Sequence, residues 1–127
     1  MEVYFYIIMC PVLFCLLDVL TGYAAAMRNG TLNSSIMRKG LWNKTAEILA
    51  ILAAILAQMG VRVYGDSFLS VQLDIPIIEI ICGCLSLYEL TSVVENLGKM
   101  NRDIAEILVK TLGIDPEKVG LEVKTND

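Results

Sequence analysis

The sequence predicts an all-α integral membrane protein with three transmembrane helices followed by a C-terminal amphipathic helix. The chain has 127 residues, and its 56% hydrophobic content exceeds what a soluble domain of this size usually carries. The apolar residues form three runs, at about 3–27, 45–61 and 70–90. Each run approaches the roughly 20 residues that a helix needs to cross about 30 Å of hydrocarbon. We therefore expect a membrane domain over residues 1–100 and an amphipathic helix with a charged tail over 101–127.

The first run is predicted to be one helix with a small and polar face. The residues that share this face at helical steps are Pro11, Cys15, Asp18, Gly22 and Ala25. Gly22 and Ala26 are four residues apart, a spacing that lets another helix backbone approach closely. Asp18 either bonds to a neighbouring helix for packing only or lines a water-filled path, and the residues leave both interpretations open.

Residues 28–44 are predicted to form a loop that lies on the membrane. Asn29 and Gly30 give a turn signal, and a short amphipathic turn follows from Asn33 or Ser34. Trp42 suits the depth of the lipid headgroups.

The second run contains no charge from residue 46 to residue 59 except Glu47 at its start. Its alanines recur at three and four residues, which places small side chains along one face and favours close contact between helices. These candidate packing residues are Ala46, Ala50, Ala53, Ala54 and Ala57, and they join Gly22 and Ala26 of the first run.

The third run carries an acid, Glu79, near its middle. A central charge costs about 2.5 to 3.5 kcal/mol on insertion scales, and the isoleucines and leucines around Glu79 offset that cost. Polar residues at intervals of three or four predict a polar seam along this helix, made of Glu79, Cys82, Ser86, Glu89, Ser92 and Asn96. Alternatively, the chain from Glu89 onward has left the bilayer as an interfacial segment.

The candidate residues for a pore or polar path are Asp18, Thr21, Glu79, Ser86, Glu89, Ser92, Glu95 and Asn96. No Lys or Arg falls inside a predicted span, so we expect these acids to find backbone, hydroxyl, water, proton or intersubunit partners.

The segment after the third run has the mixed polar and apolar composition of a water-exposed helix. Ile104, Ile107, Leu108 and Leu112 recur at helical spacing, and Gly113 is placed to end the helix. The tail from residue 114 onward is charged, and we expect it to be mobile.

Several classes of function are disfavoured by composition. Histidine is absent, which removes the usual proton shuttle and the commonest metal ligand. The net charge of −4 comes without a basic surface of the kind that binds nucleic acid. The four cysteines fall inside apolar runs and are interpreted as small hydrophobic residues rather than a disulfide or metal site: Cys10, Cys15, Cys82 and Cys84. We expect no enzyme activity, no cofactor, no metal and no nucleic-acid partner.

The distribution of basic residues predicts the orientation. The loop after the first run and the segment after the third carry the basic residues that lie close to the spans: Arg28, Arg38, Lys39, Lys44, Lys99 and Arg102. The opposite side has only Arg62. Because positive charge favours the cytoplasmic side, we expect the N-terminus outside and the C-terminus in the cytoplasm.

Two stretches resemble motifs of the phage holin family that includes the clostridial toxin-secretion holins. The first runs from Asp18 through Val19, Leu20 and Thr21 to Gly22, together with Ala26, Asn33, Ser35, Gly40 and Lys44. The second is Tyr-Glu-Leu-Thr-Ser-Val-Val-Glu-Asn-Leu over residues 88–97, in which Tyr88 stands where the family often has Asn. The resemblance implies a multi-pass protein of the bacterial cytoplasmic membrane that self-associates and opens lesions. An endolysin, or in relatives a large toxin, passes these lesions without necessarily binding the protein.

The leading hypothesis is therefore a homo-oligomeric lesion former. The alternative is a small ion or proton channel, or an accessory transporter subunit, that uses Asp18 and Glu79 as relay groups. The sequence further predicts that Gly22→Leu blocks assembly, and that Glu79→Gln preserves insertion but alters the opening threshold.

Overall fold

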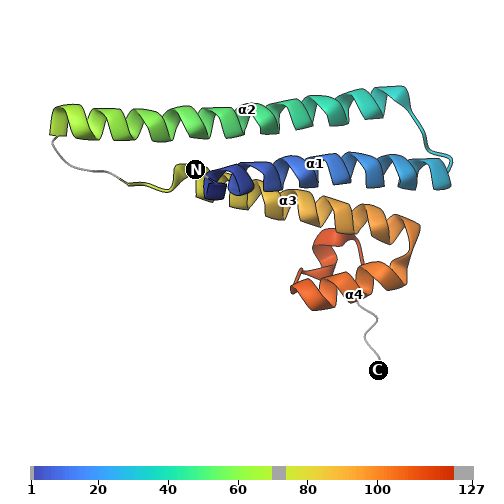
Figure 1. Cartoon of the computed structure of the whole chain (residues 1–127). Helices are drawn as coiled ribbons and strands as arrows, with labels where there is room; N and C mark the ends of the chain where they lie inside the picture. The colour runs from blue at the N-terminus through green and yellow to red at the C-terminus, as the bar shows by residue number, and fades with distance from the viewer. Residues whose placement is uncertain (1, 70–73, 122–127) are drawn as a thin grey trace.

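A computed structural model describes residues 2–69 and 74–121, which form three long helices and a short C-terminal unit packed against the third (Figure 1). The elements, in chain order, are α1 (Glu2–Arg28), α2 (Ser34–Tyr64), a π-helical turn η1 (Gly65–Leu69), α3 (Ile77–Met100), α4 (Arg102–Leu112) and a 3-10 turn η2 (Pro116–Val119). No strand occurs within these described ranges, so the predicted all-α class is confirmed.

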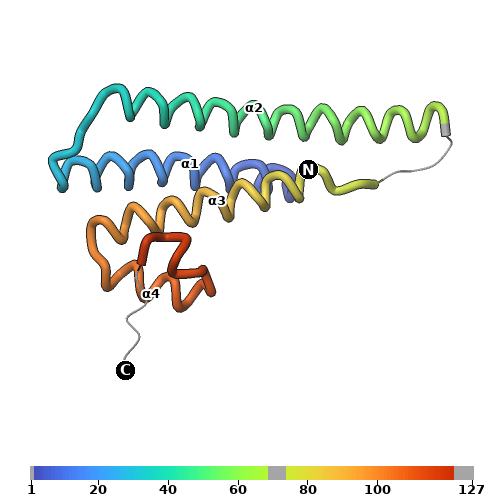
Figure 2. The backbone as a smooth tube through the Cα atoms, turned by 180° about the vertical axis from the view of Figure 1, so that it is seen from behind, coloured from blue at the N-terminus to red at the C-terminus, as the bar shows by residue number. Residues whose placement is uncertain are grey.

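Three helices are long and apolar enough to cross a membrane: α1, α2 with its π-helical extension, and α3. α1 and α3 run in the same direction and α2 runs antiparallel to both, as the two views of the backbone show (Figures 1 and 2). The end of α1 and the end of α3 therefore lie at the same end of the bundle, and the prediction of a three-span integral membrane protein is confirmed.

The bundle is held by a small apolar core and by contacts of α1 and α2 on α3. Ile51 of α2 packs with Ile78 and Cys82 of α3, and Ile7 and Val12 of α1 complete this core. Most large hydrophobic side chains point outward instead; Leu13, Leu20, Leu49, Leu52 and Leu56 are among those that are more than half exposed. Such a surface is unfavourable in water and is accommodated by lipid.

The predicted membrane-surface loop over residues 28–44 is wrong for most of its length. Asn33 is extended, and its side-chain oxygen accepts a hydrogen bond from the Ser35 backbone N–H at 2.9 Å, which caps a helix that begins at Ser34. Residues 34–44 are therefore the first three turns of α2, continuous with the apolar run. Lys44 lies inside a helix of the bundle as a consequence.

The third helix begins and ends later in the sequence than the predicted run at 70–90. Of the run at 70–90, residues 70–73 lie outside the described part of the chain, and residues 74–76 are not helical. α3 begins after Pro76, whose ring cannot continue a helical hydrogen-bond ladder toward the N-terminus, and it continues to Met100.

The predicted C-terminal amphipathic helix is present as α4. Asn101 ends α3 and begins α4, because its backbone is extended and its side chain accepts hydrogen bonds from the N–H groups of Asp103 and Ile104. α4 then packs on α3 through a second core, which contains Val94, Ala105, Val109, Val119 and Leu121. The tail was expected to be mobile from residue 114 onward. Its described part is instead packed as far as Leu121, and residues 122–127 lie outside the described part.

Candidate functional site

A buried ionic cluster of Asp18, Lys44, Glu47 and Glu89 joins the three long helices. The Lys44 ammonium lies 2.8 Å from an Asp18 carboxylate oxygen and 2.5 Å from a Glu89 carboxylate oxygen, and it also lies 3.7 Å from Glu47. Each of the four side chains is 15% exposed or less, and Glu89 is only 1% exposed. One cation therefore connects acids from α1, α2 and α3 in the interior of the bundle.

Asn96 extends the ionic cluster along α3. Its side-chain amide donates to an Asp18 carboxylate oxygen at 2.9 Å, and it lies 3.5 Å from the Thr21 hydroxyl. Gly22 provides the space for this amide, because a Cβ atom at residue 22 would lie 3.3 Å from the Asn96 nitrogen. The small residue on α1 thus admits a polar side chain of the same protomer.

Helical spacing brings these residues together. On α1, Asp18, Thr21 and Gly22 share one face, and on α3, Glu89 and Asn96 are two turns apart on one face. Lys44 and Glu47 are one turn apart on α2, and both side chains point into the bundle. The cluster lies ten residues before Arg28 at the end of α1, which corresponds to about 15 Å along the helix.

The expectation that the intramembrane acids lack a basic partner within the spans is wrong. Lys44 pairs with Asp18 and Glu89 because α2 begins earlier than predicted, which brings Lys44 into the bundle. A signal was available in the sequence: Lys44, Glu47, Ile51, Ala54 and Gln58 recur at steps of three and four and mark the inward face of α2.

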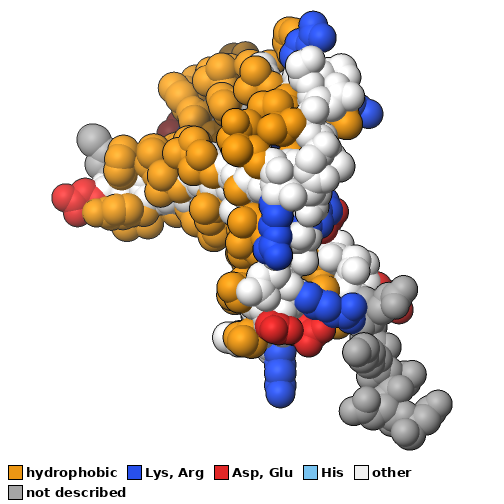
Figure 3. All heavy atoms as spheres, turned by 90° about the vertical axis from the view of Figure 1, so that its right-hand side faces the viewer, with side chains coloured by type: hydrophobic (Ala, Val, Ile, Leu, Met, Phe, Trp, Pro, Cys, Tyr) orange, Lys and Arg blue, Asp and Glu red, His pale blue; other side chains and the backbone are white. Residues whose placement is uncertain are grey.

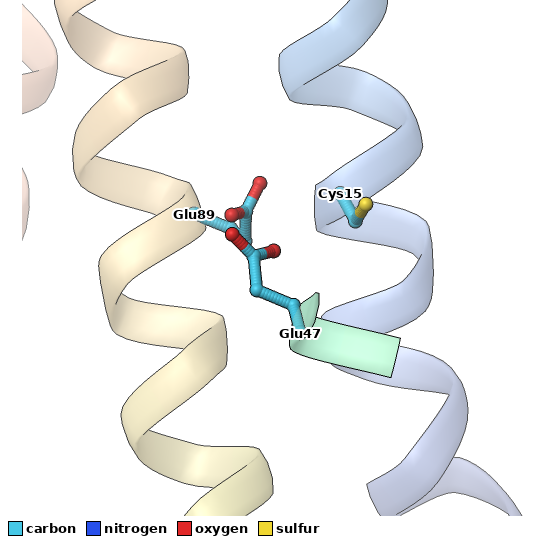
Figure 4. Close-up of side chains that lie close together, drawn as sticks. All are labelled: Cys15, Glu47 and Glu89. Atoms are coloured by element: carbon cyan, nitrogen blue, oxygen red, sulfur yellow. The ribbon is translucent and has the colours of Figure 1, made fainter. Parts of the chain in front are cut away.

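Three of the atoms at this site could approach a metal ion. The Cys15 sulfur and carboxylate oxygens of Glu47 and Glu89 lie within 4.8 Å of one another, and they come from three different helices (Figure 4). The Lys44 ammonium already contacts both Glu47 and Glu89. A cation at this point would have to displace Lys44, so the arrangement is explained by an internal ion-pair network.

Energetically, such a network holds helices together only while it is complete. Charges removed from water lose their hydration, and mutual attraction plus hydrogen bonds must offset that loss. The cluster has one ammonium for three carboxylates, and the Asn96 amide adds a hydrogen bond to Asp18. Separation of any one long helix would leave buried charge without its partner.

Two further polar contacts lie toward the other end of α2. Gln58, 3% exposed, accepts a hydrogen bond from the Ile78 backbone N–H at 2.8 Å, which replaces the side-chain cap that Pro76 cannot provide to α3. Arg62 donates to the Tyr4 hydroxyl at 3.1 Å and to Asp74 at 2.9 Å on an exposed surface. Sequence reasoning assigned no role to Gln58, and its place at an inward helical step was the available signal.

The other predicted polar-path residues occupy varied positions. The Ser86 hydroxyl donates to the Cys82 backbone carbonyl at 2.7 Å, and Glu95 forms an ion pair with Lys99 at 2.8 Å. Ser92 and Glu79 are partly buried, and one Glu79 carboxylate oxygen is enclosed without a hydrogen-bond partner. The structure brings together Asp18, Thr21, Glu89 and Asn96 and leaves Glu79 apart from them.

The predicted packing residues divide between the inside and the outside of the protomer. Ala54 is buried within the bundle, Gly22 and Ala26 are partly buried, and the other alanines of the stripe are exposed: Ala46, Ala50, Ala53 and Ala57. Those four lie on a surface of α2 that the described part of the chain leaves exposed.

The fold and the ionic cluster define a class of small multi-pass helical membrane protein with a charged interior. The chain matches the bacteriophage holin family over residues 3–114, a range that reaches from the first turn of α1 past the end of α4 and includes every member of the cluster. The protein belongs to the bacteriophage holin family, whose members act in phage lysis and are generally not enzymes. Searches of curated proteins and of solved structures found no match.

The two stretches that resembled the holin motifs supply three of the four residues of the cluster, and Glu47 lies outside both. Asp18 and Lys44 come from the first stretch, and Glu89 and Asn96 from the second. The motif residues thus contact one another across three helices. The residues that carry the resemblance are therefore the ones that join the helices.

Proposed function

We propose that the protein is a lesion-forming holin, which self-associates in the bacterial cytoplasmic membrane and opens a path for an endolysin. The observation that carries this proposal is the ionic cluster, which lies inside a three-span bundle and is built from both holin-like stretches. A large toxin is the alternative cargo that the resemblance implies. In either case the cargo needs a hole of sufficient size and no direct binding site on the protein.

The cluster suggests how the closed form resists premature opening. Moving α2 away from α1 and α3 separates Lys44 from Asp18 and Glu89. In lipid, the separated charges would have neither water nor partners, and that state is costly. At the edge of a water-filled lesion the same groups would be hydrated, so opening becomes favourable only when several copies create that water-filled edge together.

Self-association is proposed to use the exposed side of α2. Ala46, Ala50, Ala53 and Ala57 are exposed in the protomer, and small residues let helix backbones approach in lipid. Gly22 contacts Asn96 of its own protomer, so its part in assembly is proposed to act through the shape of the bundle.

The proposed orientation has the N-terminus outside and residues 101–127 on the cytoplasmic side, with residues 1–100 as the membrane domain. Support comes from the basic residues at the end of the bundle that holds Arg28, compared with Arg62 at the other end. Protease protection of terminal tags in inverted membrane vesicles tests this: a C-terminal tag should be digested from the cytoplasmic face, and an N-terminal tag should be protected.

The function is tested with purified protein in liposomes that contain both a small ionic dye and a folded protein the size of an endolysin. A holin should form crosslinkable oligomers and release both contents above a threshold density. A variant with large residues on the exposed α2 stripe, Ala50→Leu with Ala53→Leu, should release neither. Retention of both contents by dense, correctly inserted protein would contradict the proposal.

A second candidate is a small ion or proton channel, or an accessory transporter subunit. Three carboxylates around one ammonium, together with the unpartnered Glu79 oxygen, are groups that could exchange protons. The same liposomes separate the two functions, because a relay would release or exchange ions while the folded protein stays inside.

A further inference from the structure

We propose that α4 lies in the lipid headgroup layer beside α3, with Ile104 and Ile107 inserted among the acyl chains. α4 has two apolar edges. Ala105 and Val109 form the inner edge and are 0% and 6% exposed against α3. Ile104 and Ile107 form an outer edge that no residue of 2–69 or 74–121 covers, with 47% and 64% of their surfaces exposed.

The depth of α4 follows from its connection to α1. Between Asp18 and Arg28, α1 contains no charged residue, so Arg28 marks the level at which the apolar surface of α1 ends. The Arg28 side chain donates a hydrogen bond to the backbone carbonyl of Met100, the last residue of α3. The end of α3 therefore lies at the level of the membrane surface, not far out in the cytoplasm.

From that level the chain turns back toward the bilayer. Asn101 reverses its direction, and Ala105 approaches Gly98 so closely that a Cβ atom at residue 98 would lie 3.4 Å from the Ala105 Cβ. Further along, Val109 shares a core with Val94. α4 thus runs back beside the last turns of α3 (Figure 1). In a membrane it would lie on the bilayer side of the level that Arg28 marks, with its outer edge toward lipid.

The charged residues of α4 are compatible with this depth because they occupy a separate stripe. Arg102, Glu106 and Lys110 follow one another at four-residue steps, and Arg102 pairs with Glu106 at 2.8 Å. Figure 3 views the molecule from the end at which α1 and α3 end. Lys and Arg side chains are spread over this end surface, and hydrophobic side chains cover the neighbouring flank. Although α4 runs back along α3 and not in the membrane plane, its long charged side chains can extend to phosphates and water while its apolar edge contacts the acyl chains.

The test uses the full-length chain in lipid vesicles, with Trp42→Phe to remove the single native tryptophan. In that background, Ile107→Trp places a fluorophore on the outer edge, and Lys110→Trp is the matched control on the charged stripe. Lipids brominated near the top of the acyl chain should lower the emission of the Ile107→Trp variant by about twofold or more relative to the control. Ile104→Trp is a second outer-edge variant in case one substitution disturbs folding.

Equal quenching of the outer-edge variants and the control would overturn the proposal. So would quenching at residue 107 that disappears as the protein-to-lipid ratio rises, because a second copy would then cover this edge. The result is independent of lesion formation, since it depends only on membrane insertion and on the position of α4.

Discussion

Lys44 is the residue on which the interior of the bundle depends most. Its ammonium is the one cation among three carboxylates from α1, α2 and α3, and the four side chains are nearly excluded from solvent. Removing one partner of a buried pair leaves the other charged and unpaired, which is more damaging than removing the whole pair. The stability of a variant should therefore depend on whether one charge of the cluster is removed alone or together with its partners.

Lys44→Met is expected to destabilise the folded protein by about 3–5 kcal/mol, because three carboxylates then face one another without a cation. Lys39→Met, at an exposed position five residues earlier on α2, is the matched control and should change stability by less than about 0.5 kcal/mol. Unfolding of the detergent-solubilised protein by SDS, followed by circular dichroism, measures both. Adding Asp18→Asn and Glu89→Gln to Lys44→Met should recover much of the loss, and equal stability of the two single variants would contradict the role of the cluster.

Gly22→Leu is expected to lower stability by about 1–3 kcal/mol, because the added side chain displaces the Asn96 amide from Asp18. We also expect fewer crosslinked oligomers, as a secondary result of the altered bundle. Gly83→Leu is the control, since a Cβ atom at that helical glycine would meet nothing within 4 Å. If Gly22→Leu abolished oligomers while leaving the unfolding curve unchanged, Gly22 would instead belong to a contact between protomers.

At the residue scale, the candidate residues chosen from the sequence include Asp18 and Glu89 of the ionic cluster but neither Lys44 nor Glu47. Asp18, Glu89 and Asn96 stood out because polar residues in apolar runs are rare and recur here at helical steps. Lys44 was missed because the basic residues and Trp42 before the second apolar run looked like a surface loop. Gln58 was missed because one neutral amide in a helix gives no pattern, and its contact with the Ile78 N–H depends on tertiary packing.

At the scale of the elements, α2 is attached to the bundle along one narrow side. Its inward residues are Lys44, Ile51, Ala54 and Gln58, and most of its other large hydrophobic side chains are exposed. Gln58 has a specific part in this attachment, because its oxygen accepts a hydrogen bond from the first turn of α3. A residue of one helix thereby fixes the starting point of another.

Gln58→Leu should weaken the start of α3, because the buried Ile78 N–H loses its acceptor, a change worth about 1–3 kcal/mol. Gln58→Glu retains an acceptor oxygen, and a carboxylate at a helix N-terminus is electrostatically favourable. Hydrogen exchange of the Ile78 amide in detergent micelles should accelerate at least about fivefold in the Leu variant and much less in the Glu variant. Similar acceleration in both variants would show that the shape of the side chain at residue 58, and not its hydrogen bond, protects the Ile78 amide.

The existence of each helix could be predicted from the sequence, but the boundaries could not. Long apolar runs and the spacing from Ile104 to Leu112 depend on local composition, which is why α1, α2, α3 and α4 were all expected. The start of α2 at Ser34 and the start of α3 at Ile77 depend on the Asn33 cap and on Pro76. The packing of residues 114–121 on α3 is a tertiary effect without a local signal.

At the scale of the whole molecule, the three-helix bundle encloses an ionic cluster while most of its large hydrophobic side chains face outward, unlike a water-soluble bundle. The ionic cluster lies in the half of the bundle nearer Arg28, whereas Glu79 lies near the start of α3, in the other half. Glu79 has one enclosed carboxylate oxygen with no hydrogen-bond partner. An enclosed polar atom without a partner is unfavourable, and exposure to water on opening would relieve it.

Glu79→Gln is therefore expected to leave insertion and expression unchanged and to shift the onset of lysis in cells, because a neutral side chain gains less from hydration on opening. Glu95→Gln is a suitable comparison, since Glu95 forms an exposed ion pair with Lys99 and should affect timing little. Optical density of induced cultures, matched for protein level by immunoblot, gives the onset time. Identical onset for wild type and Glu79→Gln would remove Glu79 from the opening step.

The uneven exposure of the four thiols bears on how the molecule can be chemically labelled. Cys10 and Cys84 are exposed on the outside of the helices, Cys15 is intermediate, and Cys82 is enclosed beside Ile51 and Ile78. Alkylating reagents that dissolve in the bilayer should modify the outer pair in the folded protein and reach Cys82 only after α1 or α2 has moved away from α3. The reactivity of that one native sulfur consequently reports on helix separation without any engineered probe.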